Sequence, residues 1–90
     1  MSDVLILKGA LQEARQASMR HATQAEGLIS SIRNLAQHAA VIPLRELRTK
    51  ELLEMARQLD DTVDRYRRER ERVAAIRRDL GMPPEMGAYE

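Results

Sequence analysis

The chain of 90 residues is long enough for one domain, and its 43% hydrophobic residues include no Phe, no Trp and only two Tyr. This composition, rich in Ala and Leu, disfavours a β-sheet and favours helices. The formal net charge of +1 does not indicate a nucleic-acid or membrane partner, and the absence of Cys excludes disulfides and Cys-based zinc sites. The apolar run from Val4 to Leu7 is too short for a signal peptide or a membrane span, so we expect a cytoplasmic protein.

A first helix is predicted over residues 3–39. Apolar residues recur there at alternating spacings of three and four, from Val4 to Ala39. Residues at this spacing lie on one stripe of an α-helix, which can pack against a second helix. The polar residues Ser18 and His21 interrupt the stripe near its middle.

Two glycines and one proline disfavour helical structure in the first half of the chain. Gly9 and Gly27 lie inside the predicted helix, and each costs about 1 kcal/mol relative to Ala. Gly27 therefore predicts a bend, or a place where another helix approaches closely. A turn is predicted over residues 40–43, because Pro43 disfavours helical geometry at the residue before it.

A second helix is predicted over residues 44–80, with Thr49 as an alternative start because it is a good capping residue. Gly81 is placed to end this helix, and the prolines that follow prevent its continuation. Residues 81–90 are expected to form a short extended tail. The helix centres on apolar residues spaced seven apart, namely Leu52, Leu59, Tyr66, Val73 and Leu80.

The two stripes predict an all-α fold, an antiparallel two-helix hairpin resembling a coiled coil. With the bend near residue 42, residues whose numbers add to about 84 should face each other, as in an αα-hairpin. This register pairs Leu11 with Val73 and Ser18 with Tyr66. A single seam leaves most side chains in water, so we expect dimerisation to complete a four-helix bundle.

Apolar residues outside the seam mark a surface for that partner near the turn. We expect this surface to bind a second copy of the chain, related by a two-fold axis, or another helical protein. Its residues are Ala22, Ile29, Ala36, Leu53 and Met55.

An arginine cluster occupies the second half of the second helix, with only Glu69 and Glu71 between its members. It could form a basic face for RNA or DNA phosphates, or bind an acidic protein. Equally, it could be a solvated surface with ion pairs such as Asp64 to Arg68. No aromatic platform or nucleic-acid motif accompanies it, which favours the solvated surface. The cluster comprises Arg65, Arg67, Arg68, Arg70, Arg72, Arg77 and Arg78.

Ser18, His21 and Tyr66 form a predicted polar layer within the seam. Such a layer usually fixes the register of paired helices at some cost in stability. A pH-sensitive switch at His21 is the alternative, because histidine titrates near neutral pH.

No motif in the sequence indicates catalysis. There is no HExxH motif and no Gly-rich phosphate loop, and His21 and His38 are too far apart on one helix to share a metal. A two-helix rod has no sheltered site for acid–base chemistry. We therefore expect no enzyme activity, no catalytic residue, no cofactor, no metal and no small-molecule substrate.

These observations predict a non-catalytic interaction module, an adaptor or an assembly component that acts through helix–helix packing. An RNA- or DNA-binding hairpin using residues 65–78 is the alternative. In size and architecture, the chain resembles the small helical hairpins among bacterial secretion chaperones and phage accessory proteins. The resemblance is one of architecture and carries over no functional residue.

Overall fold

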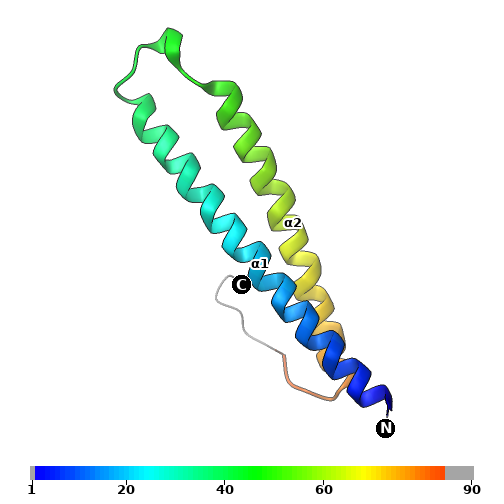
Figure 1. Cartoon of the computed structure of the whole chain (residues 1–90). Helices are drawn as coiled ribbons and strands as arrows, with labels where there is room; N and C mark the ends of the chain where they lie inside the picture. Colours follow the sequence, from blue (N-terminus) through cyan, green and yellow to red (C-terminus); the bar gives the residue numbers. More distant parts are fainter. Residues whose placement is uncertain (1, 85–90) are drawn as a thin grey trace.

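The computed structural model describes residues 2–84 and shows two long helices that lie antiparallel and pack against each other (Figure 1). Helix α1 spans Ser2–Ala39 and helix α2 spans Thr49–Asp79. A single 3₁₀ turn, η1, covers Leu44–Glu46 in the connection between them. The molecule is a rod with principal extents of 64 × 18 × 13 Å. The predicted all-α helical hairpin is confirmed.

The connection between the helices is longer than the predicted turn, and α2 begins at Thr49 rather than at residue 44. Pro43 has an extended ψ of 145°, and Glu46 N–H then donates to its carbonyl at 2.9 Å, which closes η1. Leu47 returns to an extended conformation with ψ 127°, so the 3₁₀ turn cannot continue into α2. Thr49 is the first helical residue and not the cap, since Arg48 holds the N-cap position without a side-chain hydrogen bond.

Helix α1 is not interrupted at Gly27, and no helix of the described chain approaches this residue closely. A Cβ atom built on Gly9 or Gly27 would meet nothing within 4 Å. These glycines therefore do not serve packing within the described part of the hairpin.

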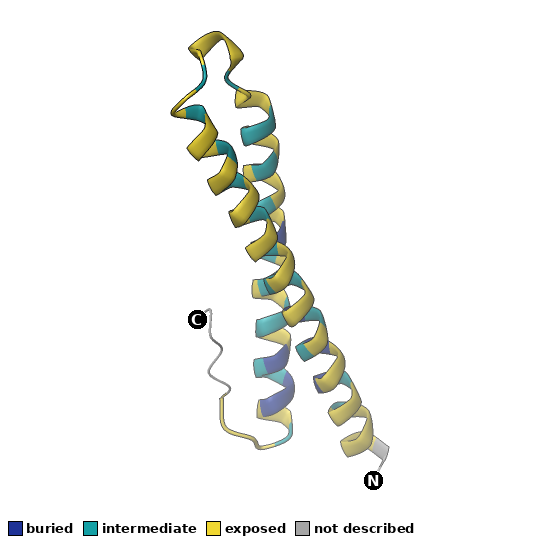
Figure 2. Cartoon of the chain, turned by 60° about the vertical axis from the view of Figure 1, so that its left-hand side comes forward, coloured by how far each residue is buried: buried dark blue, intermediate teal, exposed yellow. Residues whose placement is uncertain are grey.

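The fully buried core lies at the end of the rod where α1 begins and α2 ends (Figure 2). Ala14 and Val73 are 0% and 1% exposed, and Leu11 and Ile76 complete the cluster. Leu11 and Val73, which the register pairs, thus lie in the same cluster. The small side chain of Ala14 favours close packing of the helices here.

Toward the turn, the seam residues of both helices are only half-buried. No apolar residue described on the turn side of Ala14 and Val73 reaches the buried class. Hydrophobic stabilisation scales with the apolar area removed from water, so this half of the seam is the weaker one. The residues concerned are Leu28, Ile32, Leu35, Leu52 and Leu59.

The end of α2 is closed by the glycine that the sequence marks. Gly81 has φ +70°, and its N–H donates to the Arg78 carbonyl at 3.0 Å. Met82 N–H donates to the Arg77 carbonyl at 2.8 Å. This pair of bonds is a Schellman motif, which reverses the chain direction. Of the predicted tail, residues 81–84 are described, and 85–90 lie outside the described residues.

Two glycine substitutions should have opposite effects on stability. Gly27→Ala should raise the free energy of unfolding by about 1 kcal/mol, because the site is helical and open. Gly81→Ala should lower it by about 1–2 kcal/mol, because an L-residue is strained at this positive φ. Urea unfolding followed by circular dichroism measures both. Loss of stability in Gly27→Ala would contradict the open surroundings assigned to that residue.

Candidate functional site

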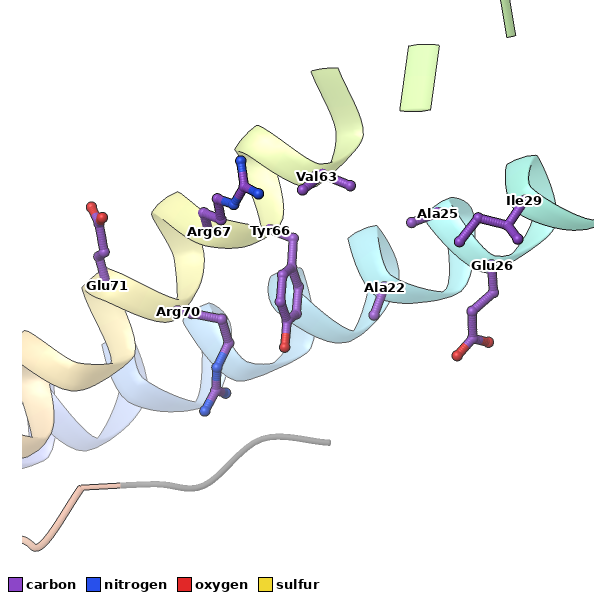
Figure 3. A pocket seen from close by; sticks show the side chains of 9 residues that line it. All are labelled: Ala22, Ala25, Glu26, Ile29, Val63, Tyr66, Arg67, Arg70 and Glu71. Atoms are coloured by element: carbon purple, nitrogen blue, oxygen red, sulfur yellow. The ribbon is translucent and has the colours of Figure 1, made fainter. Parts of the chain in front are cut away.

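A groove lies between the helices midway along the rod, on the turn side of the buried core (Figure 3). Its volume is about 500 Å³. Small or apolar side chains make up much of its lining, and four charged residues complete it. The lining residues are Ala22, Ala25, Glu26 and Ile29 of α1, with Val63, Tyr66, Arg67, Arg70 and Glu71 of α2.

Helical spacing explains why these residues meet. On α1, Ala22 and Ile29 are seven apart and flank the seam residue Ala25. On α2, Val63 and Arg70 are likewise seven apart and flank Tyr66. The two alanines leave a gap that larger side chains would fill, and this gap is the groove.

The apolar lining continues from the groove toward the turn. Ile29 is 44% exposed, and Ala36 follows it seven residues later on the same side of α1. Leu53, 70% exposed, lies in the seven-residue row of Asp60 and Arg67, and Arg67 lines the groove. We call Ile29, Ala36 and Leu53 the turn-proximal surface.

The structure distributes the five predicted interface residues over more than one site. Ala22 and Ile29 line the groove. Met55 instead lines a separate hollow with His38 and Glu51, on the other side of the seam. A helical wheel could have separated Met55 from Leu53, because residues two apart point in different directions.

The seven arginines do not share one face of α2. Arg70 is half-buried in the groove, whereas Arg77 is only 9% exposed and donates from Nε to the Pro83 carbonyl at 2.7 Å. Arg67 Nη1 lies 3.4 Å from Asp64 Oδ1. The residues predicted to point away from the seam, Arg67, Arg68 and Arg78, are exposed, as is Arg65.

Arg72 links the two helices at the core end through one ion pair and forms another within α2. Its guanidinium lies 4.0 Å from the Glu13 carboxylate of α1 and 3.8 Å from that of Glu69. The Arg72 and Glu13 side chains are half or more exposed, so these contacts contribute little to stability. Ion pairs therefore already engage part of the predicted basic face.

Ser18 and His21 of the predicted polar layer lie in the seam, and Ser18 makes its hydrogen bond within its own helix. Ser18 is 3% exposed, and its hydroxyl donates to the Arg15 carbonyl of its own helix at 2.9 Å. His21 is half-buried, and its Nδ1 is buried without a hydrogen bond within the part of the chain described. Leaving such an atom unpaired is unfavourable, so His21 weakens the seam at this level.

Two further polar residues belong to this layer and were not predicted. Thr62 is 3% exposed and donates to the Gln58 carbonyl at 2.8 Å. Glu69 is half-buried, with one carboxylate oxygen, Oε2, buried and without a hydrogen bond among the described residues. Both stand between the apolar members of the row Met55 to Ile76, which has the seven-residue spacing of a second seam row. Thr62 and Glu69 would have been predicted as seam residues if the helical spacing had been followed through polar as well as apolar positions.

Among the described carboxyl groups, that of Glu54 has a clearly shifted pKa, and it lies in a surface cluster. Hydrogen bonds from Arg57 at 2.7 Å and from Gln58 at 3.3 Å lower the pKa of Glu54 below its ordinary value. The same contact raises the pKa of Arg57. All three side chains are exposed and lie toward the turn, so this cluster does not create acid–base chemistry at the groove.

The described part of the chain has neither a metal site nor a helix that could cross a membrane. Among residues 2–84, no group of three His, Asp or Glu side chains comes close enough to hold a metal ion. None of the helices in the described part of the chain is long and apolar enough to cross a membrane. No protein-family model, curated protein or solved structure matches the chain.

A pair of valines tests where the core ends and the groove begins. Val73→Ala should lower the free energy of unfolding by about 2 kcal/mol, because two methyl groups leave a buried site. Val63→Ala, at the half-exposed groove, should cost less than about 1 kcal/mol. Denaturant unfolding of the two variants under the same conditions makes the comparison. Equal losses would show that the groove is packed as tightly as the core.

Proposed function

We propose that the protein is a non-catalytic interaction module that binds a helical partner on its turn-proximal surface. The observation that supports this most strongly is the uneven burial of the seam, with a full core at one end and half-buried leucines at the other. Covering Ile29 and Leu53 with apolar side chains would remove their exposed area from water. The simplest partner is a second copy of the hairpin, which gives a four-helix bundle.

In the proposed complex, the arginines of α2 set the orientation of the bound partner. Exposed arginines crowd the core end of α2, whereas the turn-proximal surface is apolar. In the proposed complex, burial at the turn end supplies affinity. The arginines at the other end favour approach of acidic groups and fix the orientation of the partner.

Introducing charge on the turn-proximal surface tests the proposal. Ile29→Glu with Leu53→Glu should convert a dimer into a monomer, because burying two unpaired carboxylates is costly. The hairpin itself should stay folded, since both side chains are largely exposed in it. Light scattering at micromolar concentration measures the mass, and circular dichroism the helix content.

Val41→Glu is the matched control, because Val41 is 80% exposed but lies in the connection between the helices. Its mass should equal that of the unmodified chain. A monomeric unmodified chain would remove the second copy as partner. A double variant that dimerises as well as the control would overturn the turn-proximal surface as the interface.

The alternative function is binding of RNA or DNA by the arginines. It is supported by the exposure of Arg65, Arg67, Arg68 and Arg78, although they spread around α2 rather than along one face. Phosphate contacts release counterions, so affinity for mixed nucleic acid should fall steeply with added salt. Absence of binding at low ionic strength would exclude this function.

A further inference from the structure

An apolar row on the groove side of α1 is centred on Ile29. Ala22 precedes Ile29 by seven residues and Ala36 follows it by seven, so all three lie on one flank of the helix. Ile29 is 44% exposed and Ala36 is exposed, although α2 packs on the adjacent seam. In Figure 3, Ala22 and Glu26 extend to the same side of α1, and both line the groove. This flank is therefore open to a helix from outside the hairpin.

One acidic and one basic residue border the row. Glu26 lies three residues before Ile29 and Arg33 lies four residues after it, so both stand along the same flank. Neither has an oppositely charged residue three or four positions away in α1, where helix neighbours pair. Both are exposed, and neither forms an ion pair within residues 2–84. Their charges are thus open to an outside partner.

The row and its charges complement themselves when a second copy is reversed. With a two-fold axis at Ile29, residues of the two α1 helices face each other when their numbers add to 58 or 59. Ala22 then faces Ala36 of the other copy, and Ile29 meets Ile29. Glu26 of each copy faces Arg33 of the other, which gives two attractive pairs. A parallel copy would place Glu26 against Glu26 and Arg33 against Arg33, which is unfavourable.

A row on α2 has its centre at the same level of the rod. Thr49, Ala56 and Val63 are seven apart, and Val63 lines the groove with Ala22. Facing residues of the hairpin add to about 84, so Ala56 is level with residue 28, next to Ile29. Thr49 and Ala56 are exposed and uncharged. One two-fold axis therefore serves both helices, with α1 stacked on α1 and α2 on α2.

We infer that the partner of the turn-proximal surface is a second copy of the hairpin, stacked antiparallel about a two-fold axis at Ile29 and Ala56. Glu26 of each copy pairs with Arg33 of the other, and these pairs select the antiparallel orientation. The small side chains of the two rows let the helices approach closely. This inference rests on the proposed function for the location of the interface. It adds the identity of the partner, its direction and the residues that select it.

Reversal of single charges tests the pairing. Arg33→Glu should raise the Kd of the dimer roughly tenfold, and so should Glu26→Arg, because both pairs of the dimer become repulsive. A one-to-one mixture of the two variants should dimerise like the unmodified chain, since every pair is then attractive again. Sedimentation equilibrium at low ionic strength measures the Kd where exposed charges interact most strongly. Circular dichroism should show an unchanged hairpin, because both side chains are exposed.

Arg20→Glu is the matched control for the reversal of Arg33. Arg20 is also an exposed arginine of α1 without an oppositely charged residue three or four positions away. It lies nine residues before Ile29, about two and a half turns, and so points to the opposite side of the helix. The control changes the net charge equally but should leave the Kd unchanged. An equal loss in the control, or a mixture of the two interface variants that stays monomeric, would overturn the inference.

Engineered cysteines test the direction of stacking. The chain has no Cys, so Ala22→Cys and Ala36→Cys each introduce a single thiol. Oxidation of a mixture of the two variants should give a disulfide-linked dimer, because these positions face each other. Either variant alone should give several-fold less, since its two thiols are about 21 Å apart along the axis of an antiparallel dimer. Efficient cross-linking of Ala22→Cys with itself would indicate a parallel dimer and overturn the inference.

The outcomes separate this inference from the proposed function. An unmodified chain that stays monomeric at micromolar concentration would overturn the second copy as partner, and would leave another helical protein for the turn-proximal surface. A dimer that Ile29→Glu with Leu53→Glu disrupts, but that neither charge reversal weakens, would overturn this inference and support the proposed function. A dimer that none of these variants weakens would overturn both.

Discussion

The structure depends on one seam between two helices, and polar residues divide that seam. Ser18, His21 and Thr62 stand where apolar side chains would otherwise interlock. Ser18 and Thr62 satisfy their hydroxyls within their own helices, so they add no bond between α1 and α2. Among the described residues, full burial of apolar side chains is confined to the end of the rod beyond this layer.

The uneven seam connects the fold to the functional proposals. At the core end, the hairpin buries Leu11, Ala14, Val73 and Ile76 without a partner. At the middle, Ala22 and Ala25 leave the groove, and toward the turn Ile29 and Leu53 remain exposed. A small domain has little stability to spare, and in the proposed function a partner covers this apolar surface.

Much of the fold could be predicted, because it follows from periodicity. The row from Leu52 to Leu80 predicts a helix, and Gly81 predicts its end; both signals depend on neighbouring residues alone. The structure has a helix over this row that ends before Gly81. The connection at residues 44–48 was predicted only through the alternative start at Thr49, since Leu44 and Leu47 have the spacing of helix residues. Its path depends on the backbone angles of Pro43 and Leu47.

The site was predicted less completely than the fold. Ala22 and Ile29 were predicted as interface residues and both line the groove, but the groove also needs Ala25, Val63 and Tyr66, whose approach depends on the register of both helices. Thr62 and Glu69 were missed because polar residues conceal a seam row when only apolar spacing is followed. The arginines were predicted to form one basic face because they are close in sequence, but neighbouring residues of a helix point to different sides.

Hydrogen exchange of the backbone amides tests the central claim most directly. Chain ends normally fray first, yet this hairpin is packed best near its ends and least near its turn. In dilute protein, amides of residues 28–38 and 52–59 should exchange faster than those of residues 10–14 and 73–76. Their protection should rise with protein concentration or on adding a partner. Equal protection along both helices at every concentration would contradict the account.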